Sequence, residues 1–371
     1  MQLTQDVIRL SKTYKTPFLL VDLEQLRQNY RDIKSSIDNV EIFYAMKAND
    51  NPVILAELAK EGCSFEISSL QELKTVQKLN VKPEQIMCFN SIKNAEFLKE
   101  MHKHKIKVMA FDSKDEIDKI AKYAPHSELV LRVNVTNEGS EWPLTKKFGI
   151  DAVEAVPLMK YAQRKKVKII GLTFHVGSQC LNKNNWASAL LVCEEIWHQA
   201  AKIGVNLSFI SLGGGIPVKH MKQIPSMKEI GDVINKSIKK NFTTIKNNLR
   251  ITIEPGRGLV GDTAIMVTKV VGRAKRGTED WLYIDAGVFN GFMETIEGFT
   301  YELKTEKNGK KKLVTIAGPS CDSVDIPFKN VMLPSVKIDD YIYAINAGAY
   351  TTVYAAPFNG FAVPEVHFIN K

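Results

Sequence analysis

The sequence predicts an eight-stranded parallel β/α barrel followed by a second, mostly antiparallel β domain. Two observations lead to this prediction. Short β-rich runs alternate with helical patterns, and chemically reactive side chains directly follow several of these runs. An open, doubly wound sheet has the same alternation and is the alternative. The barrel is favoured because barrels build their active sites at the carboxyl ends of their strands.

The candidate strands are short runs rich in β-branched and aromatic residues. They lie at residues 42–48, 64–68, 86–90, 108–111, 129–135, 169–175, 209–212 and 250–254. Helix-like segments lie between them, among them residues 53–61, 70–79, 94–102, 152–164 and 186–201. Because strands and helices alternate, we expect parallel strands with the helices packed outside them.

The pattern changes after about residue 258, where β-like runs continue without long helices. These runs lie at residues 264–271, 281–284, 312–316, 341–346 and 366–369. An early run at 18–21 precedes the barrel strands, and we expect it to join this second domain. The predicted organisation is an N-terminal segment at 1–30, a barrel at 31–258 and a C-terminal β domain at 259–371.

Length and composition indicate a globular protein with a large core. The chain has 371 residues, of which 44% are hydrophobic and 25% charged, and this length suggests about two domains. No apolar run approaches the roughly 18 residues that span a membrane, and the first residues lack the apolar stretch of a signal peptide. We therefore expect a cytoplasmic protein without a membrane partner.

Charge and cysteine usage argue against nucleic acid and metal. The formal net charge is +9, but lysine and arginine are spread along the chain. The densest run, residues 310–312, is interpreted as a solvated hairpin tip, so no nucleic-acid partner is expected. The five cysteines are odd in number, widely spaced and without a Cys-x-x-Cys pair or a nearby histidine cluster, which indicates reduced thiols and no metal site.

Lys47 is the candidate amine for a Schiff base with an aldehyde. It lies in the sequence Phe-Tyr-Ala-Met-Lys-Ala-Asn at 43–49, at the end of an apolar run. An ammonium is costly to bury, so we expect burial to favour the neutral amine that condenses with an aldehyde. The alternative is a lysine that reaches from the strand end into water.

Two loops are candidates for a phosphate site. Gly213, Gly214 and Gly215 follow the seventh run, and the segment Glu254-Pro-Gly256-Arg257 follows the eighth. Barrels commonly bind phosphate with these two loops, where backbone N–H groups approach the anion and an arginine adds a charge-assisted contact. Ser178 and Tyr350 are further hydroxyl donors. A triple glycine by itself is also compatible with a simple tight turn.

Glu254 and His175 are candidates for holding an aromatic ring. The Glu254 carboxylate would keep a pyridine nitrogen protonated, and a protonated ring accepts electrons from the substrate α-carbon. His175, at another strand end, would stack on the ring. The alternatives are a salt bridge for Glu254 and a structural role for His175. Together with Lys47 and the glycine loop, these residues predict a pyridoxal phosphate site.

The ordered motifs resemble a known family, the pyridoxal phosphate decarboxylases with an alanine-racemase-like barrel. Its members act on ornithine, lysine, arginine or diaminopimelate. The chain is most similar to the bacterial ornithine/lysine decarboxylases, and the resemblance extends over almost the whole chain. It rests on four segments: Phe-His-Val-Gly-Ser at 174–178, Gly-Pro-Ser-Cys-Asp-Ser at 318–323, Gly-Ala-Tyr-Thr at 348–351 and Phe-Asn-Gly-Phe at 358–361.

The resemblance implies the cofactor contacts. Lys47 would bond the aldehyde, Glu254 would pair with the pyridine nitrogen and His175 would stack on the ring. The phosphate would be held by Ser178, Gly215, Arg257 and Tyr350. Arg132 and Glu72 match positions around the cofactor, and Glu66 stands where animal ornithine decarboxylases have an aspartate.

The resemblance also implies a homodimer with shared active sites. Cys321 and Asp322 would reach the cofactor of the partner chain, where Cys321 reprotonates the substrate α-carbon and Asp322 binds the distal amine. A second distal carboxylate is either Glu297, by ungapped comparison, or Glu294. Phe358 is a further candidate substrate contact.

The expected reaction is the decarboxylation of ornithine to putrescine or of lysine to cadaverine, as in polyamine biosynthesis. Ornithine ranks above lysine and arginine, and one methylene discriminates by only about 1–3 kcal/mol. Diaminopimelate would be repelled by Asp322, and members that accept it have Glu-Ser at this point. A racemase would have a tyrosine near Cys321, and a non-catalytic relative would tolerate the loss of Lys47 or Cys321.

Overall fold

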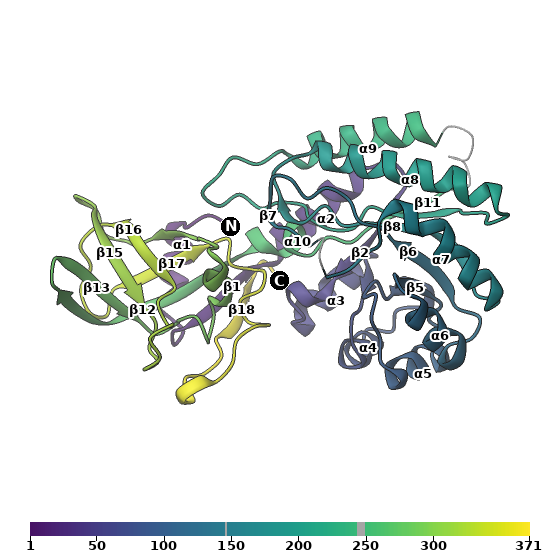
Figure 1. The fold of residues 1–371 in the computed structure, drawn as a ribbon. Coiled ribbons are helices and arrows are strands. Elements are labelled where there is room, and N and C mark those ends of the chain that lie inside the picture. The colour runs from purple at the N-terminus through teal and green to yellow at the C-terminus, as the bar shows by residue number, and fades with distance from the viewer. Residues whose placement is uncertain (145–146, 243–248) are drawn as a thin grey trace. The chain divides into compact units, whose positions relative to one another are not determined.

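The computed structural model describes residues 1–144, 147–242 and 249–371 of the chain. Two compact units are present (Figure 1). One comprises Arg27–Pro217 and Ile224–Gly258, and the other comprises Met1–Leu26, Val218–Gln223 and Leu259–Lys371. Each unit is described by itself.

The first unit is a closed parallel barrel, which confirms the predicted fold. Its strands are β2 (Val40–Ala45), β3 (Ser64–Glu66), β4 (Ile86–Met87), β5 (Val108–Phe111), β6 (Glu128–Arg132), β8 (Lys168–Thr173), β10 (Phe209–Ser211) and β11 (Arg250–Ile253). Neighbours along the chain pair in parallel, and β11 pairs with β2. A parallel bridge between Cys88 and Met109 closes the gap between β4 and β5, where the Ala110 N–H donates to Cys88 O at 2.8 Å. The doubly wound alternative is therefore wrong.

Alternate strand residues fill the barrel interior, as expected for side chains that point to opposite faces along a strand. The buried cluster consists of Phe43, Met87, Phe89, Val108, Ala110, Val130, Ile170 and Phe209. Large aromatic and small residues combine there, so the barrel is a packed core. Ligands are therefore left to the strand ends.

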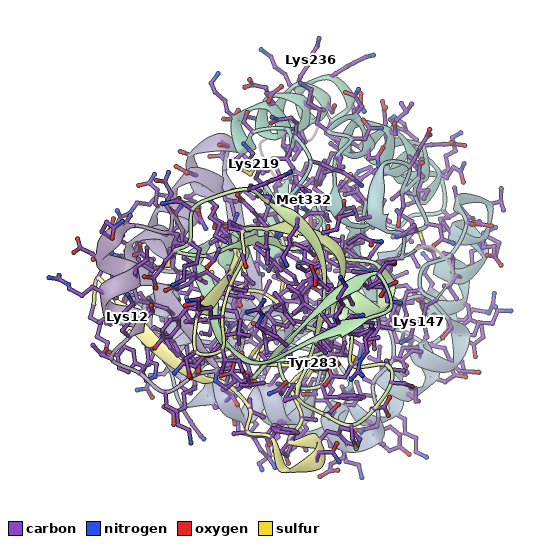
Figure 2. All side chains as sticks on the ribbon, turned by 90° about the vertical axis from the view of Figure 1, so that its left-hand side faces the viewer. Lys12, Lys147, Lys219, Lys236, Tyr283 and Met332 are labelled. Atoms are coloured by element: carbon purple, nitrogen blue, oxygen red, sulfur yellow. The ribbon has the colours of Figure 1, made fainter. Side chains whose placement is uncertain are left out.

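Helices follow most barrel strands and lie outside them (Figure 1). They are α3 (Pro52–Lys60), α4 (Leu70–Gln77), α5 (Ala95–Lys103), α6 (Lys114–Tyr123), α7 (Ala152–Arg164), α8 (Asn184–Lys202) and α9 (Met227–Asn241). Two further helices, α1 (Gln5–Ser11) and α2 (Leu23–Ser36), precede β2. Helices α1, α2, α6 and α9 are not among the segments that the sequence analysis named. Lys236 extends from α9 into solvent (Figure 2). None of the helices in the described residues is long and apolar enough to cross a membrane.

A short antiparallel ribbon is added to the barrel unit. It pairs β7 (Ser140–Trp142) with β9 (Ser178–Cys180), so that Trp142 lies opposite Ser178. The sequence analysis did not predict this ribbon. It matters because Ser178 is one of the candidate phosphate donors.

The second unit is a mostly antiparallel β domain, as predicted. It contains β1 (Phe18–Asp22), β12 (Ala264–Arg276), β13 (Glu279–Ile284), β14 (Glu302–Lys304), β15 (Lys312–Ala317), β16 (Phe328–Leu333), β17 (Tyr341–Ile345) and β18 (Glu365–Ile369). The early strand β1 pairs with β12 on one side and with β18 on the other. The β1–β18 and β13–β15 pairs are parallel, and the other pairs are antiparallel.

The segment at 310–312 is exposed, but it is not a hairpin tip. The preceding strand β14 pairs with β17, whereas the following strand β15 pairs with β13 and β16. The turn therefore connects two strands that are not hydrogen-bonded to each other. Asn308-Gly309 suggested a hairpin because this type of dipeptide favours tight turns, but pairing depends on the flanking strands.

Candidate active site

Lys47 lies just beyond the end of β2, on the short 3-10 helix η1 (Met46–Ala48). Its neighbours Met46 and Ala48 are buried, but the Lys47 side chain is exposed. The expected burial of this amine is therefore wrong, because the chain turns at Ala45 and aims the residue out of the strand. Its charge nevertheless acts on the site. Burial raises the pKa values of Glu254 and Glu72, and the charge of Lys47 opposes this rise.

Glu254 directly follows β11 at the same end of the barrel. Its carboxylate accepts hydrogen bonds from Ser211 Oγ and, at 3.4 Å, from Thr173 Oγ1. Burial, reinforced by the negative charge of Glu66, raises the pKa of Glu254 to about 7, although the Ser211 hydrogen bond opposes this rise. The carboxyl group therefore titrates near neutral pH. A cation that approaches it would favour its ionised form.

Glu66 and Arg132 complete the charge balance around Glu254. Glu66 ends β3, is buried, and accepts hydrogen bonds from Phe89 N–H at 3.2 Å and Ser68 Oγ at 3.3 Å. Arg132 ends β6, and its guanidinium carbon lies 5.0 Å from the centre of the Phe148 ring. Burial lowers the pKa of Arg132, while the charge of Glu254 is the largest opposing effect. One arginine therefore interacts with both glutamates.

Glu72 lies in the first turn of α4, close to this group. Its side chain accepts a hydrogen bond from the Ser68 N–H, and its own N–H donates to Ser69 Oγ at 3.2 Å, which caps the helix. Burial raises the pKa of Glu72 to about 7, and the Ser68 hydrogen bond opposes that rise. Glu72 therefore interacts with the charges of both Glu66 and Lys47.

His175 follows β8 and is held as a neutral imidazole. The Gly177 N–H donates to His175 Nδ1 at 3.0 Å, so this nitrogen carries a lone pair and the proton lies on Nε2. Burial lowers the pKa of His175 well below its usual value, and the charges of Arg132 and Lys47 act in the same direction. An uncharged ring of this kind can lie against another aromatic ring without repelling a cation on it.

The glycine loop packs directly against His175 and Glu254. A Cβ at Gly214 would lie 2.7 Å from Glu254 O and 3.1 Å from His175 Nε2. Gly215 has a φ of +100°, and its carbonyl accepts the Cys180 N–H at 2.9 Å. The absence of side chains therefore brings this backbone against both ring-holding candidates.

Arg257 and Ser178 are linked through Trp142. Arg257 begins the short helix α10 (Arg257–Val260), is only 5% exposed, and has its guanidinium carbon 4.8 Å from the centre of the Trp142 ring. Trp142 in turn pairs with Ser178 across the β7–β9 ribbon. Gly256 is buried beside Arg257. The structure thus collects the barrel candidates at one end of the strands.

Sequence analysis missed three residues of this site: Ser211, Thr173 and Trp142. Ser211 and Thr173 end β10 and β8, so the strand-end rule that singled out Lys47 also applied to them. Trp142 had no such signal, because its role depends on the β7–β9 pairing.

The remaining candidates lie in the β domain, where Cys321 and Asp322 occupy one exposed loop. The backbone N–H and the Sγ of Cys321 both lie 3.2 Å from Asn359 Oδ1. Asp322 Oδ1 accepts the Val324 N–H at 2.9 Å. Phe358, next to Asn359, is 40% exposed, and its ring centre is 4.5 Å from that of Phe289. Cys321, Asp322 and Phe358 thus belong to one cluster.

The buried Asp325 holds this loop in place. Its carboxylate accepts the N–H groups of Val288 at 2.7 Å and Ser320 at 2.9 Å, and its carbonyl accepts the Gly318 N–H at 2.8 Å. A Cβ at Gly318 would lie 2.2 Å from this carboxylate. The loop that carries Cys321 is therefore fixed from within.

Glu294 and Tyr350 have different surroundings. Glu294 lies on the 3-10 helix η5 (Met293–Glu297) and is 9% exposed, whereas Glu297 is exposed. Tyr350 has a left-handed φ of 56°, and its ring centre is 5.6 Å from that of Tyr354.

Comparison with known proteins agrees with this fold. Residues 23–261 match the model of the pyridoxal-dependent decarboxylase family, in its pyridoxal binding domain. The chain therefore belongs to the pyridoxal-dependent decarboxylases, which are carboxy-lyases that work with pyridoxal phosphate, and the expectation from the motifs is confirmed.

Particular relatives are similar over nearly the whole chain. The lysine/ornithine decarboxylase of Selenomonas ruminantium is 34% identical over 359 residues, which are 96% of this chain and 90% of that protein. The structure of SrLDC in complex with PLP and cadaverine matches with a TM-score of 0.92 at 33% identity, covering 100% and 94% of the two chains. The lysine/ornithine decarboxylase of Vibrio vulnificus with putrescine matches with a TM-score of 0.91 at 28% identity, covering 100% and 99%.

Proposed function

We propose that this chain decarboxylates L-ornithine and L-lysine to putrescine and cadaverine. The observation that carries the proposal is the grouping of Glu254, His175 and the glycine loop at the barrel end, close to the charge of Lys47. The relatives that match nearly the whole chain are lysine/ornithine decarboxylases, which supports the same substrates.

The residues fit pyridoxal phosphate on three points. A cation brought to Glu254 by a protonated ring nitrogen would relieve the cost of ionising this partly buried carboxyl group. The neutral His175 suits a position against the ring. The glycine backbone packs against Glu254 and His175, and a glycine-rich loop at a strand end can offer N–H groups to a phosphate. When bound, the cofactor supplies an electron sink for the electrons left on the substrate α-carbon as carbon dioxide departs.

In this proposal, each residue of the chain has a defined task. Lys47 would hold the cofactor at its aldehyde carbon through the side-chain amine. Glu254 holds the ring proton, while Glu66 and Arg132 set the charge around it. The phosphate is held by the set Ser178, Gly213, Gly214, Gly215, Gly256, Arg257 and Tyr350.

The β-domain loop supplies the proton and recognises the substrate. Cys321 Sγ donates a proton to the α-carbon after carbon dioxide has left. The exposed carboxylate of Asp322 binds the distal ammonium, as a carboxylate attracts a cation. Glu294, buried on η5, adds negative charge for the same ammonium, and Phe358 contacts the aliphatic part of the substrate.

We also propose a cytoplasmic homodimer in which Cys321 and Asp322 of one chain serve the cofactor of the other. The barrel candidates and the loop of Cys321 belong to different compact units, which is compatible with such sharing.

The proposal is tested by measuring carbon dioxide release from the purified protein with pyridoxal phosphate. Ornithine, lysine, arginine and diaminopimelate are supplied separately, and the amine product is identified by mass spectrometry. We expect release from ornithine and lysine, with ornithine preferred by no more than roughly 200-fold, the limit that one methylene sets. A preference for arginine or diaminopimelate would show that the proposed substrates are wrong. If no substrate releases carbon dioxide while cofactor absorbance shows full loading, the proposed reaction is wrong.

A further inference from the structure

Asn359 lies at the tip of a tight turn beside Cys321. Asn359 has a φ of 53° and Gly360 a φ of 80°, so two consecutive residues are left-handed. Asparagine is one of the few residues with a side chain that tolerates this conformation. The turn is closed by the Gly360 N–H, which donates to Pro357 O at 3.1 Å, and it is attached to Phe289 O through the Ala356 N–H at 2.8 Å. The position of the Asn359 side chain is therefore set by its backbone.

The contacts of Asn359 define where the thiol proton lies. The Cys321 backbone N–H can only donate, and it meets the side-chain amide of Asn359 at 3.2 Å. The amide must therefore turn its oxygen, and not its NH₂ group, toward Cys321. Cys321 Sγ lies at the same distance, 3.2 Å, from this same oxygen. An oxygen of this kind has no proton to give, so the sulfur is the donor and carries its proton.

The Cys321 loop is fixed on both sides. Asp325 binds the Ser320 N–H from inside the domain, and Asn359 binds the next N–H along the chain, that of Cys321. The remaining freedom of Cys321 is rotation of its side chain, and the contact of Sγ with Asn359 restricts this rotation. This arrangement holds a protonated sulfur at one place on an exposed surface.

We propose that Asn359 is a positioning residue that accepts the S–H of Cys321 and so holds its sulfur in place for proton donation. This inference rests on the proposed function, in which Cys321 protonates the substrate. In that step the S–H bond breaks and its electrons stay on sulfur, while a C–H bond forms with the electron pair on the α-carbon. The S–H bond turns away from Asn359 by rotation about the Cβ–Sγ bond, so the sulfur itself does not move. After the proton has been donated, solvent reprotonates the sulfur.

The test uses the rate at which iodoacetamide alkylates Cys321 in the full-length protein loaded with pyridoxal phosphate. The thiolate is the reactive form, and the other four cysteines are buried, so the rate reports on Cys321. Asn359→Gly keeps the left-handed backbone but removes the acceptor. We expect alkylation roughly two- to fivefold faster at neutral pH, as loss of one weak hydrogen bond implies. Asn359→Asp keeps shape and acceptor but adds a negative charge, and we expect slower alkylation than in the wild type.

The matched control is Asn330→Gly, which replaces another exposed left-handed asparagine of the same domain. This variant should leave the alkylation rate unchanged. Faster alkylation in Asn359→Gly without slowing in Asn359→Asp would mean that only access to the sulfur had changed, and it would overturn the inference. Equal rates in all variants would overturn it too.

The two hypotheses fail in different ways. If the wild type decarboxylates none of the four amino acids, the proposed function fails, but the alkylation series still tests the contact between Asn359 and Cys321. If the wild type is active, Asn359→Gly should lower kcat more than it raises KM for ornithine, because the contact acts on proton donation. A change in KM alone would contradict a positioning role.

Discussion

Glu254 occupies an environment that opposes its own ionisation. It shares the barrel end with Glu66, and burial is the main reason that its pKa is raised to about 7. Ser211, Arg132 and Lys47 reduce this rise without abolishing it. In the proposed function, this carboxyl group would lose its proton when a cationic ring nitrogen binds beside it.

This raised pKa predicts a pH-dependent stability for the cofactor-free protein. The folded state holds the Glu254 proton up to about pH 7, whereas the unfolded chain releases it near the usual glutamate pKa of 4.5, so stability falls as pH rises between these values. We expect the free energy of unfolding to fall by about 1–3 kcal/mol more in the wild type than in Glu254→Gln between pH 5 and pH 8. Urea denaturation at both pH values measures this difference.

Glu297→Gln is the control for this prediction, because Glu297 is exposed. It should show the same pH dependence as the wild type. Parallel behaviour of the wild type and Glu254→Gln would show that Glu254 is ionised in the folded protein at pH 7.

Several site residues were predictable from the sequence because they follow strand ends. Lys47, His175 and Glu254 were found in this way, and the structure gathers them at one end of the barrel. The exposure of Lys47 was not predictable, since it depends on the turn that η1 makes after Ala45. Trp142 and Asn359 were not assigned roles because their contacts join segments distant in sequence, at Arg257 and Cys321.

At the scale of elements, the barrel closes where its strands are shortest. β4 contains two residues, and its connection to β5 is a single bridge at Cys88. The fully buried Lys93 reinforces this place: its Nζ donates to Asn90 O at 2.8 Å and Ala110 O at 2.7 Å and lies 2.9 Å from Glu116 Oε1 on α6. One ammonium thus connects two strand ends and a helix.

This arrangement predicts a large loss of stability in Lys93→Met. The substitution removes the ammonium that binds two carbonyls and one oxygen of a buried carboxylate, and breaking a buried pair costs about 3–5 kcal/mol. We expect the lower end of this range, because Lys119 remains 2.6 Å from Glu116 Oε2. Thermal or urea denaturation measures the loss. Lys103→Met removes an exposed pair with Glu100 and should cost less than about 1 kcal/mol; equal effects would show that Lys93 does not connect these elements.

Two helices and one strand that the sequence analysis did not name differ in their local sequence signals. α6 begins after Ser113, whose side chain accepts the Glu116 N–H, and α9 begins with a capping box of Ser226 and Glu229. Both signals are present in the sequence and were available. β16 is different: it contains the left-handed Asn330, and its pairing with β15 shifts register, so it lacks a regular alternating pattern.

At the scale of the whole molecule, the proposed active site draws on both compact units. Lys47 and Glu254 belong to the barrel unit, and Cys321 and Asp322 to the β domain. If the proposed dimer shares its sites, a defect in Lys47 and a defect in Cys321 damage different components of each site. The two defects then become separable by mixing subunits.

Co-expression of Lys47→Ala and Cys321→Ala subunits should therefore restore activity that neither variant has alone. Random pairing makes half of the dimers mixed. In a mixed dimer one site receives both substitutions and the other receives neither, so we expect about one quarter of wild-type carbon dioxide release.

The control pairs Lys47→Ala subunits with the double variant Lys47→Ala/Cys321→Ala, in which no site has an intact lysine and no activity should return. Light scattering should give twice the chain mass of 41.7 kDa for every mixture. A mixture of the single variants that forms dimers but stays inactive would show that each chain builds its own complete site. In that case the loop of Cys321 would have to serve the barrel of the same chain, and the sharing of sites would be rejected while the reaction itself stands.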